Sequence, residues 1–228
     1  MSDGLVGVAD GLWCATQPLR FLGIEVGARM TVAELPSGGL LLHSPIEPQP
    51  ALRAAVEAKG PVEHVVAPNR FHHLFVGLWG DAGPRVQVHV APGLLAKRPD
   101  LAGALELGDA ADPAWGGAFD TCRVAGIPMA NEVAFLHRPS RSLLTCDLAF
   151  NVGAAQPAGT RFFFKIQGKY GRLETTFLER LLTRDRGAAK ASIERILGWD
   201  FDRVVVSHGD VLESGGHEAF RRAWSWLL

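Results

Sequence analysis

"HVVAPNRFHHLF", residues 64–75, joins a short apolar run to a polar segment that contains two adjacent histidines. The apolar run predicts a buried strand, and the Pro-Asn pair predicts where that strand ends. Ligand and catalytic side chains are common at strand ends, because the sheet holds them rigidly there. His72 and His73 are therefore either metal ligands or polar side chains at the edge of a core.

Three other predicted strands also end in polar side chains. "LLLHS" (40–44) leads to His43, "SLLTCDLAFN" (142–151) contains Asp147, and "VVVSHGD" (204–210) contains His208. Taken alone, each residue is compatible with a structural role, such as a hydrogen-bonded histidine or an aspartate that caps a turn. The convergence of four strand ends on His, Asp and Asn side chains favours a shared site.

The order of predicted elements indicates the architecture. "MTVAEL" (30–35) and "LLLHS" flank "PSGG" and predict a hairpin. Helices are expected over 48–60, over 93–101 and through most of the last sixty residues, and a second strand-rich block covers 118–150. We expect two mixed sheets between helices, in a single domain spanning residues 1–228.

Composition excludes several classes of function. The chain has 228 residues and a net charge of −1, from 23 basic and 24 acidic side chains, so a nucleic-acid partner is not expected. No apolar run is long enough for a membrane span, and no secretory signal is recognisable. Three scattered cysteines do not make a disulfide framework. We expect a cytoplasmic monomer or homodimer that acts on a small-molecule substrate.

With these motifs, the chain resembles the metallo-β-lactamase-fold superfamily, and within it a bacterial branch of unknown function (DUF4336-like). The resemblance is carried by "APNRFHHLF" (67–75), "SLLTCDLAFN" and "VVVSHGD". It implies an α/β (α+β) fold, a four-layer αββα sandwich with its site at the strand ends between two sheets. It also implies metal ions, usually two zincs.

The metal signature implied by the resemblance is incomplete here. The superfamily pattern is H-x-H-x-D-H, followed by a mid-chain histidine, a bridging aspartate and a late histidine. When its last two positions are set on His72 and His73, Pro68 and Arg70 replace the first two histidines. No histidine lies in 125–132, where the mid-chain ligand is expected. Asp147 matches the bridging aspartate and His208 the late histidine.

The resemblance thus implies that one metal pocket is lost and the other is reduced. The remaining set is His72, His73, Asp147 and His208, which suits one divalent metal: zinc first, with iron or manganese as alternatives. A fully degenerate member would bind no metal.

Further residues are candidates for the same site. His43 is a candidate catalytic residue beside Asp147, as a ligand or a proton-transfer group. Glu132 lies near the missing mid-chain histidine and is a candidate oxygen ligand; Asn69 replaces a signature histidine if the alignment shifts. Lys169 lies in a Gly-flanked loop that could contact substrate. Each also has a purely structural interpretation.

Three functions follow from this set. The first is a metal-dependent hydrolase that activates water against an ester, thioester, amide or phosphoester. The second is a degenerate, non-catalytic member that binds a ligand or a partner. The third is a non-haem-iron oxidoreductase, since a histidine-rich mononuclear site suits iron.

Overall fold

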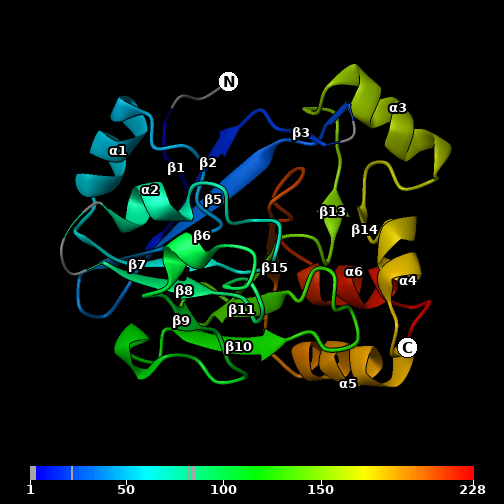
Figure 1. Ribbon diagram of the computed structural model, residues 1–228. Helices are drawn as coiled ribbons and strands as arrows, with labels where there is room; N and C mark the ends of the chain where they lie inside the picture. The colour runs from blue at the N-terminus through cyan, green and yellow to red at the C-terminus, as the bar shows by residue number, and fades with distance from the viewer. Residues whose placement is uncertain (1–3, 22, 82, 84–85) are drawn as a thin grey trace.

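The computed structural model describes residues 4–21, 23–81, 83 and 86–228, and two mixed sheets dominate it (Figure 1). The larger sheet has the strand order β1-β2-β5-β6-β7-β8-β9. Its strands are β1 (Val6–Ala9), β2 (Leu12–Gln17), β5 (Ala28–Glu34), β6 (Leu40–His43), β7 (Val62–Ala67), β8 (Gln87–Val90) and β9 (Leu105–Glu106). Pairing is antiparallel from β1 to β6 and parallel from β6 to β9. Two of the parallel crossovers carry helices α1 (Pro50–Glu57) and α2 (Val76–Gly80).

The smaller sheet has the order β10-β11-β12-β15, and its last pair is parallel. Its strands are β10 (Phe119–Arg123), β11 (Val133–His137), β12 (Ser142–Thr145) and β15 (Arg203–Val206). The crossover between β12 and β15 contains β13 (Phe150–Asn151), α3 (Ala158–Ile166), β14 (Leu173–Glu174), α4 (Phe177–Leu182) and α5 (Arg186–Leu197). The chain closes with α6 (Gly216–Ala223), and a short ribbon pairs β3 (Arg20–Phe21) with β4 (Ile24–Glu25).

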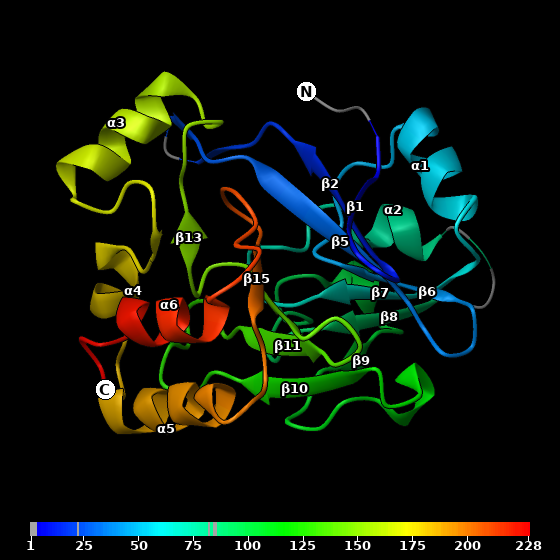
Figure 2. The same ribbon diagram turned by 180° about the vertical axis from the view of Figure 1, so that it is seen from behind.

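Alternation along the strands creates three apolar layers. Leu41 and Val66 point inward, in one cluster with Val205 of the opposite sheet. Their neighbours point outward: Leu40 and Leu42 pack with residues of α1 and α2, while Val204 and Val206 pack with residues of α5 and α6. Because successive side chains of a strand face opposite sides, each sheet packs against its helices with one face and against the other sheet with the opposite face. Figure 2 shows these helices on the outer sides of the sheets, so the predicted αββα sandwich is confirmed.

The helix expected over 48–60 is found as α1, but two other helical expectations are not met. The last sixty residues are less than half helical, because only Phe177–Leu182, Arg186–Leu197 and Gly216–Ala223 form helices there. The predicted hairpin is confirmed by the antiparallel register of β5 and β6, in which Glu34 opposes Leu40. The helix predicted over 93–101 is wrong, because only Pro99–Leu101 forms a 3₁₀ turn. Gly93 adopts a positive φ of 75°, and Pro99 lacks the N–H that a continuing helix needs.

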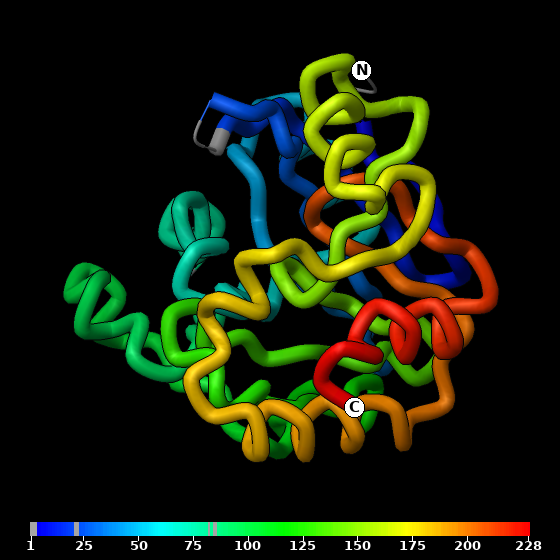
Figure 3. Tube along the Cα trace, turned by 90° about the vertical axis from the view of Figure 1, so that its right-hand side faces the viewer, coloured from blue at the N-terminus to red at the C-terminus, as the bar shows by residue number. Residues whose placement is uncertain are grey.

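The strand directions bring several strand ends to one place. β6 runs parallel to β7, and β12 runs parallel to β15, so the carboxyl ends within each pair lie at the same edge. Figure 3, turned by 90° from Figure 1, shows α5 (orange) and α6 (red) close together in the lower part of the molecule. Within the described ranges, no helix has the length and apolar character needed to span a membrane.

Candidate metal centre

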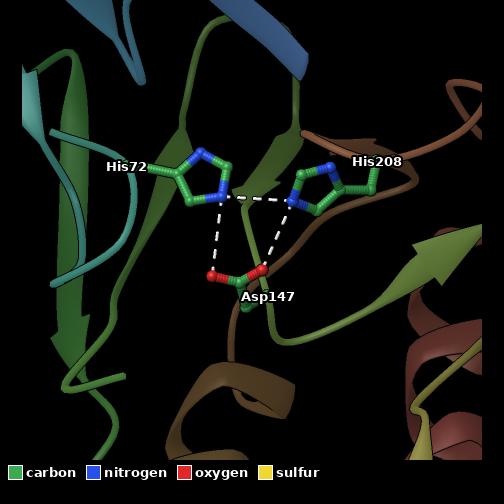
Figure 4. Close-up of side chains that lie close together, drawn as sticks. All are labelled: His72, Asp147 and His208. Atoms are coloured by element: carbon green, nitrogen blue, oxygen red, sulfur yellow. Dashed lines mark hydrogen bonds and ion pairs between the residues drawn. The ribbon is translucent and has the colours of Figure 1, made fainter. Parts of the chain in front are cut away.

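His72, Asp147 and His208 meet at the edge where β7, β12 and β15 end (Figure 4). The two imidazole Nε2 atoms are 3.2 Å apart. His72 Nε2 lies 3.5 Å from Asp147 Oδ2, and His208 Nε2 lies 3.3 Å from Asp147 Oδ1. The side chains come from three segments distant in sequence, yet their donor atoms face one another.

The spacing of these donors fits one metal ion. Zinc bonds of about 2.0–2.1 Å in tetrahedral geometry place neighbouring ligand atoms about 3.3–3.4 Å apart. The observed separations of 3.2, 3.3 and 3.5 Å lie around this value, with His208 next to Oδ1 of Asp147 and His72 next to Oδ2. Two imidazoles and one carboxylate also form the donor set of many catalytic zinc sites, which keep a further position open.

Both imidazoles are oriented by contacts at their other nitrogen. His208 Nδ1 lies 2.7 Å from the carbonyl oxygen of Gly27, which can only accept, so Nδ1 carries the proton and donates it. His72 Nδ1 lies 2.8 Å from Ser44 Oγ. Such contacts fix ring orientation in metal sites. In neutral His208, the Nε2 lone pair is therefore directed at His72 and Asp147.

The Ser44 backbone adopts an uncommon conformation. It has a φ of 54°, in the left-handed region that non-glycine residues rarely occupy, and its side chain is buried. Strained residues of this kind cluster at functional sites, where the surrounding structure maintains them. Here the strained residue carries the hydroxyl that contacts His72.

Asn69 links the triad to the surrounding loop. Its side chain is fully buried, and Nδ2 donates to Asp147 Oδ2 at 2.7 Å and to Glu132 Oε2 at 2.9 Å. Its Oδ1 accepts from the backbone N–H groups of Phe71 and His72 at 2.9 and 2.8 Å. Every hydrogen-bonding atom of this amide is therefore used, so Asn69 acts as a positioning residue rather than as a metal ligand.

Glu132 lies beneath Asp147 and accepts three hydrogen bonds. Its carboxylate accepts from the backbone N–H groups of Cys146 and Asp147 at 2.7 and 2.8 Å, and from Asn69. Burial, followed by the negative charge of Asp147, raises the pKa of Glu132 to about 7. Three N–H donors already occupy its oxygen atoms, so the geometry does not support Glu132 as an oxygen ligand.

Opposite charges within the triad stabilise each other. Burial alone would raise the pKa of Asp147, but the charges and hydrogen bonds of His72 and His208 hold that pKa well below its usual range. Burial alone would lower the pKa of His208, but Asp147 raises it above the ordinary value. The carboxylate is thus ionised and favours positive charge beside it, whether from a proton or a metal ion.

His73 does not join the cluster, contrary to the expectation. Its ring Nδ1 lies 2.9 Å from Arg98 Nη1, which also donates to the His73 carbonyl at 2.9 Å. Burial, followed by the positive charges of Lys97 and Arg98, lowers the pKa of His73 to about 4. A guanidinium at the ring nitrogen opposes a second cation there, so the structure argues against His73 as a ligand.

His43 and Lys169 also differ from their expected roles. The His43 ring is buried edge-on against Phe135, with centroids 5.0 Å apart, and within the described residues its Nε2 has no hydrogen-bond partner. Burial, followed by the charge of His72, lowers its pKa to about 3, so it is neutral and a weak base. Lys169 Nζ donates to the carbonyl of Thr175. Neither residue lies in the group of donors around Asp147.

Sequence reasoning missed three contributors to the site. These are the Gly27 carbonyl, the Ser44 hydroxyl and Phe150, whose ring stacks on His208 at 5.5 Å between centroids and 11° between planes. Ser44 follows His43 at the same strand end, and that position was its only signal. Nothing in the sequence around Gly27 or Phe150 indicates contact with His208, since these contacts depend on tertiary packing.

Comparisons with known proteins agree with this description. The sequence profile of the family described as "Domain of unknown function (DUF4336)" matches residues 9–163. No curated protein matches the sequence significantly.

Solved structures show the fold at low sequence identity. A metallo-β-lactamase from Pontibacter korlensis is 14% identical with a TM-score of 0.65, covering 98% of this chain and 97% of that one. The mono-zinc form of the metallo-β-lactamase FIM-1 from Pseudomonas aeruginosa is 10% identical with a TM-score of 0.64, covering 98% and 93%. A metallo-β-lactamase from Hirschia baltica is 9% identical with a TM-score of 0.62, covering 98% and 96%. The chain therefore belongs to the DUF4336 family, and its fold is that of the metallo-β-lactamases.

Proposed function

We propose that this protein is a metal-dependent hydrolase with a single divalent cation, zinc first, held by His72, Asp147 and His208. The observation that carries the proposal is the mutual spacing of their donor atoms, 3.2–3.5 Å. A structural neighbour described as a mono-zinc form provides a precedent for one metal on this fold. The proposed ligands are taken from the positions of this chain's own side chains and not from the structural neighbour.

A bound divalent cation with an open position would lower the pKa of a coordinated water towards neutrality. The protein's residues supply the rest of the site. The Gly27 carbonyl holds His208 in the tautomer whose Nε2 is free to bind a cation. Asn69 donates to Asp147 Oδ2, which leaves Oδ1 directed at His208 and able to orient a nucleophile by accepting a hydrogen bond from it. The proposed substrates are esters, thioesters, amides or phosphoesters.

The Asn69–Glu132 pair favours one metal over two. In the pattern implied by the resemblance, the first pocket needs three histidines, and none of them is present. In their region the structure has a neutral amide hydrogen-bonded to a carboxylate that already accepts three N–H donors. A second cation there would have to compete with these donors for the carboxylate.

The donor set also supports a second candidate, a non-haem-iron oxidoreductase. Two histidines and one carboxylate with open positions are the ligand set of many iron(II) oxygenases. The distances between the donor atoms suit zinc and iron equally, so the identity of the bound metal decides between the two functions.

Elemental analysis of protein purified without added metal tests both proposals. We expect about one equivalent of metal, lost in His208→Ala and retained in the remote control His217→Ala, whose ring bonds the carbonyl of Leu197. Zinc together with turnover of a p-nitrophenyl ester, thioester, anilide or phosphodiester supports the hydrolase. Iron with oxygen consumption supports the oxidoreductase. Failure to bind any metal, before or after reconstitution, would overturn both and leave a non-catalytic binding protein.

A further inference from the structure

A basic pocket lies on the loop that carries His72. It has a volume of about 390 Å³, and its lining residues are Arg70, Phe71, Lys97, Pro128, Met129 and Arg184. A volume of this size accommodates a small organic molecule. Three of the six residues are cationic, and none is acidic.

The cations of the pocket are not neutralised by neighbouring acids. Within the described residues, Arg70, Lys97 and Arg184 take part in none of the ion pairs. Two of them are held in place by hydrogen bonds to backbone carbonyls: Arg70 Nη1 donates to Pro128 at 3.2 Å, and Lys97 Nζ donates to Arg70 at 3.0 Å. The pocket therefore presents positive charge from partly ordered side chains and favours an anion.

The same pocket also presents apolar surface. Phe71 is 40% exposed and Met129 is 48% exposed, although both are large apolar side chains. Lys97 Nζ lies 5.9 Å from the Phe71 ring centroid, so positive charge and aromatic surface adjoin. A ligand that satisfies both features has an anionic group attached to an apolar body.

The pocket and the candidate metal centre share one rigid loop. Phe71 directly precedes His72, and both of their backbone N–H groups donate to Asn69 Oδ1. Phe71 of the pocket and His72 of the triad are therefore neighbouring residues, with Cα atoms about 3.8 Å apart. The Arg70 N–H donates to the Ala130 carbonyl at 2.9 Å, which joins this loop to the segment that carries Met129.

We propose that this pocket binds the anionic end of the protein's ligand, a carboxylate or phosphate group on an apolar body. Its role as a substrate-binding subsite rests on the proposed function, whereas binding of the anion itself does not. The cations of Lys97 and Arg184 attract the anionic group, and Phe71 and Met129 cover the apolar part. The substrate class is thereby narrowed to organic anions.

Binding of four probes to metal-free protein tests the proposal. Chelator is used to strip the metal and is then removed, so that neither metal coordination nor the chelator contributes. The probes are phenylphosphonate, phenylacetate, the neutral phenylacetamide and inorganic phosphate, each titrated by calorimetry. We expect at least one of the two aromatic anions to bind tenfold more tightly than phenylacetamide and than inorganic phosphate. Whether phenylphosphonate or phenylacetate binds more tightly distinguishes a phosphate from a carboxylate ligand.

Charge-matched variants locate the site. Arg184→Gln and Lys97→Gln each remove one pocket cation and should weaken binding roughly fivefold, the upper range for an exposed charge pair. Arg222→Gln, an exposed arginine on α6, removes the same charge elsewhere and should change affinity less than twofold. Equal binding of phenylacetamide, equal weakening by Arg222→Gln, or no binding of either aromatic anion would overturn the proposal. Because the protein is metal-free, these outcomes do not depend on whether it is a hydrolase.

Discussion

The substitution Asn69→Asp tests the hydrogen-bond network beneath the triad. The new side chain has nearly the same shape, and its retained oxygen still accepts from the N–H groups of Phe71 and His72. The other atom changes from a donor to an acceptor. It then faces Glu132 Oε2 at 2.9 Å and Asp147 Oδ2 at 2.7 Å, with no hydrogen between them. Three carboxyl groups would share a buried site.

The expected loss of stability can be bounded in two ways. Two unit charges about 4 Å apart repel by about 4 kcal/mol at an effective dielectric constant near 20. The folded variant can avoid this by keeping one proton. At pH 7, holding a proton on a carboxyl with an unfolded pKa of about 3.9 costs about 4 kcal/mol, at about 1.4 kcal/mol per pH unit. We therefore expect a loss of about 4 kcal/mol at pH 7.

The loss of stability in Asn69→Asp depends on pH, because the folded variant keeps a proton on its new carboxyl group. The pKa of the new carboxyl is raised by folding, so the penalty grows as the pH rises above the unfolded pKa and shrinks as the pH falls. At pH 5 the loss should be about 1.5 kcal/mol. Proton uptake in acid restores one hydrogen bond between the carboxyl groups.

Urea unfolding of metal-free wild type and variant at pH 5, 6 and 7 measures this directly. Asn131→Asp is the matched control, because its Nδ2 donates to one neutral acceptor, the Pro92 carbonyl, at 2.7 Å. The control should show a smaller loss with little pH dependence. A loss below about 1 kcal/mol at pH 7, or a loss that is the same at all three pH values, would show that Asn69 does not keep the two carboxylates apart.

Three further predictions follow from particular side chains. His208→Ala should abolish metal binding while His73→Ala retains it, as measured by metal content after reconstitution, because the His73 ring contacts a guanidinium. Burial lowers the pKa of His137 to about 4, so the unfolded state binds the extra proton first and stability falls as the pH drops from about 6.5 to 4. His137→Asn should reduce that fall by up to about 3 kcal/mol in urea titrations. Gly209→Ala should cost more than about 3 kcal/mol, since its Cβ would lie 2.1 Å from a backbone oxygen at a φ of +108°. Gly38→Ala, at a φ of +81° with open space around it, should cost about 1 kcal/mol in the same thermal or urea assay.

Much of the fold could be predicted from local patterns. The short apolar runs in 62–67 and 203–206 predict strands, and the turn residues after Leu35 predict the hairpin that β5 and β6 form. These signals are local, because a strand's pleat and a turn's backbone depend on adjacent residues. The 93–101 segment shows the limit: its apolar and basic residues suit a helix, but Gly93 and Pro99 prevent one from extending.

The site, like the fold, could be predicted only in part from the sequence. The sequence by itself determined which residue types follow each strand, and so indicated that His72, Asp147 and His208 stand at strand ends. The resemblance added the expectation that the first metal pocket is lost, because the histidines of its pattern are absent.

Which of those residues meet depends on the tertiary structure. His72 and His73 are adjacent in sequence, yet one ring faces His208 and the other faces Arg98. The partners that orient the triad, Gly27 and Asn69, come from other segments of the chain, 181 residues before His208 and 78 before Asp147. The direction of a side chain depends on what packs against it, and those neighbours are set by the pairing and stacking of whole sheets rather than by the residues beside it in sequence.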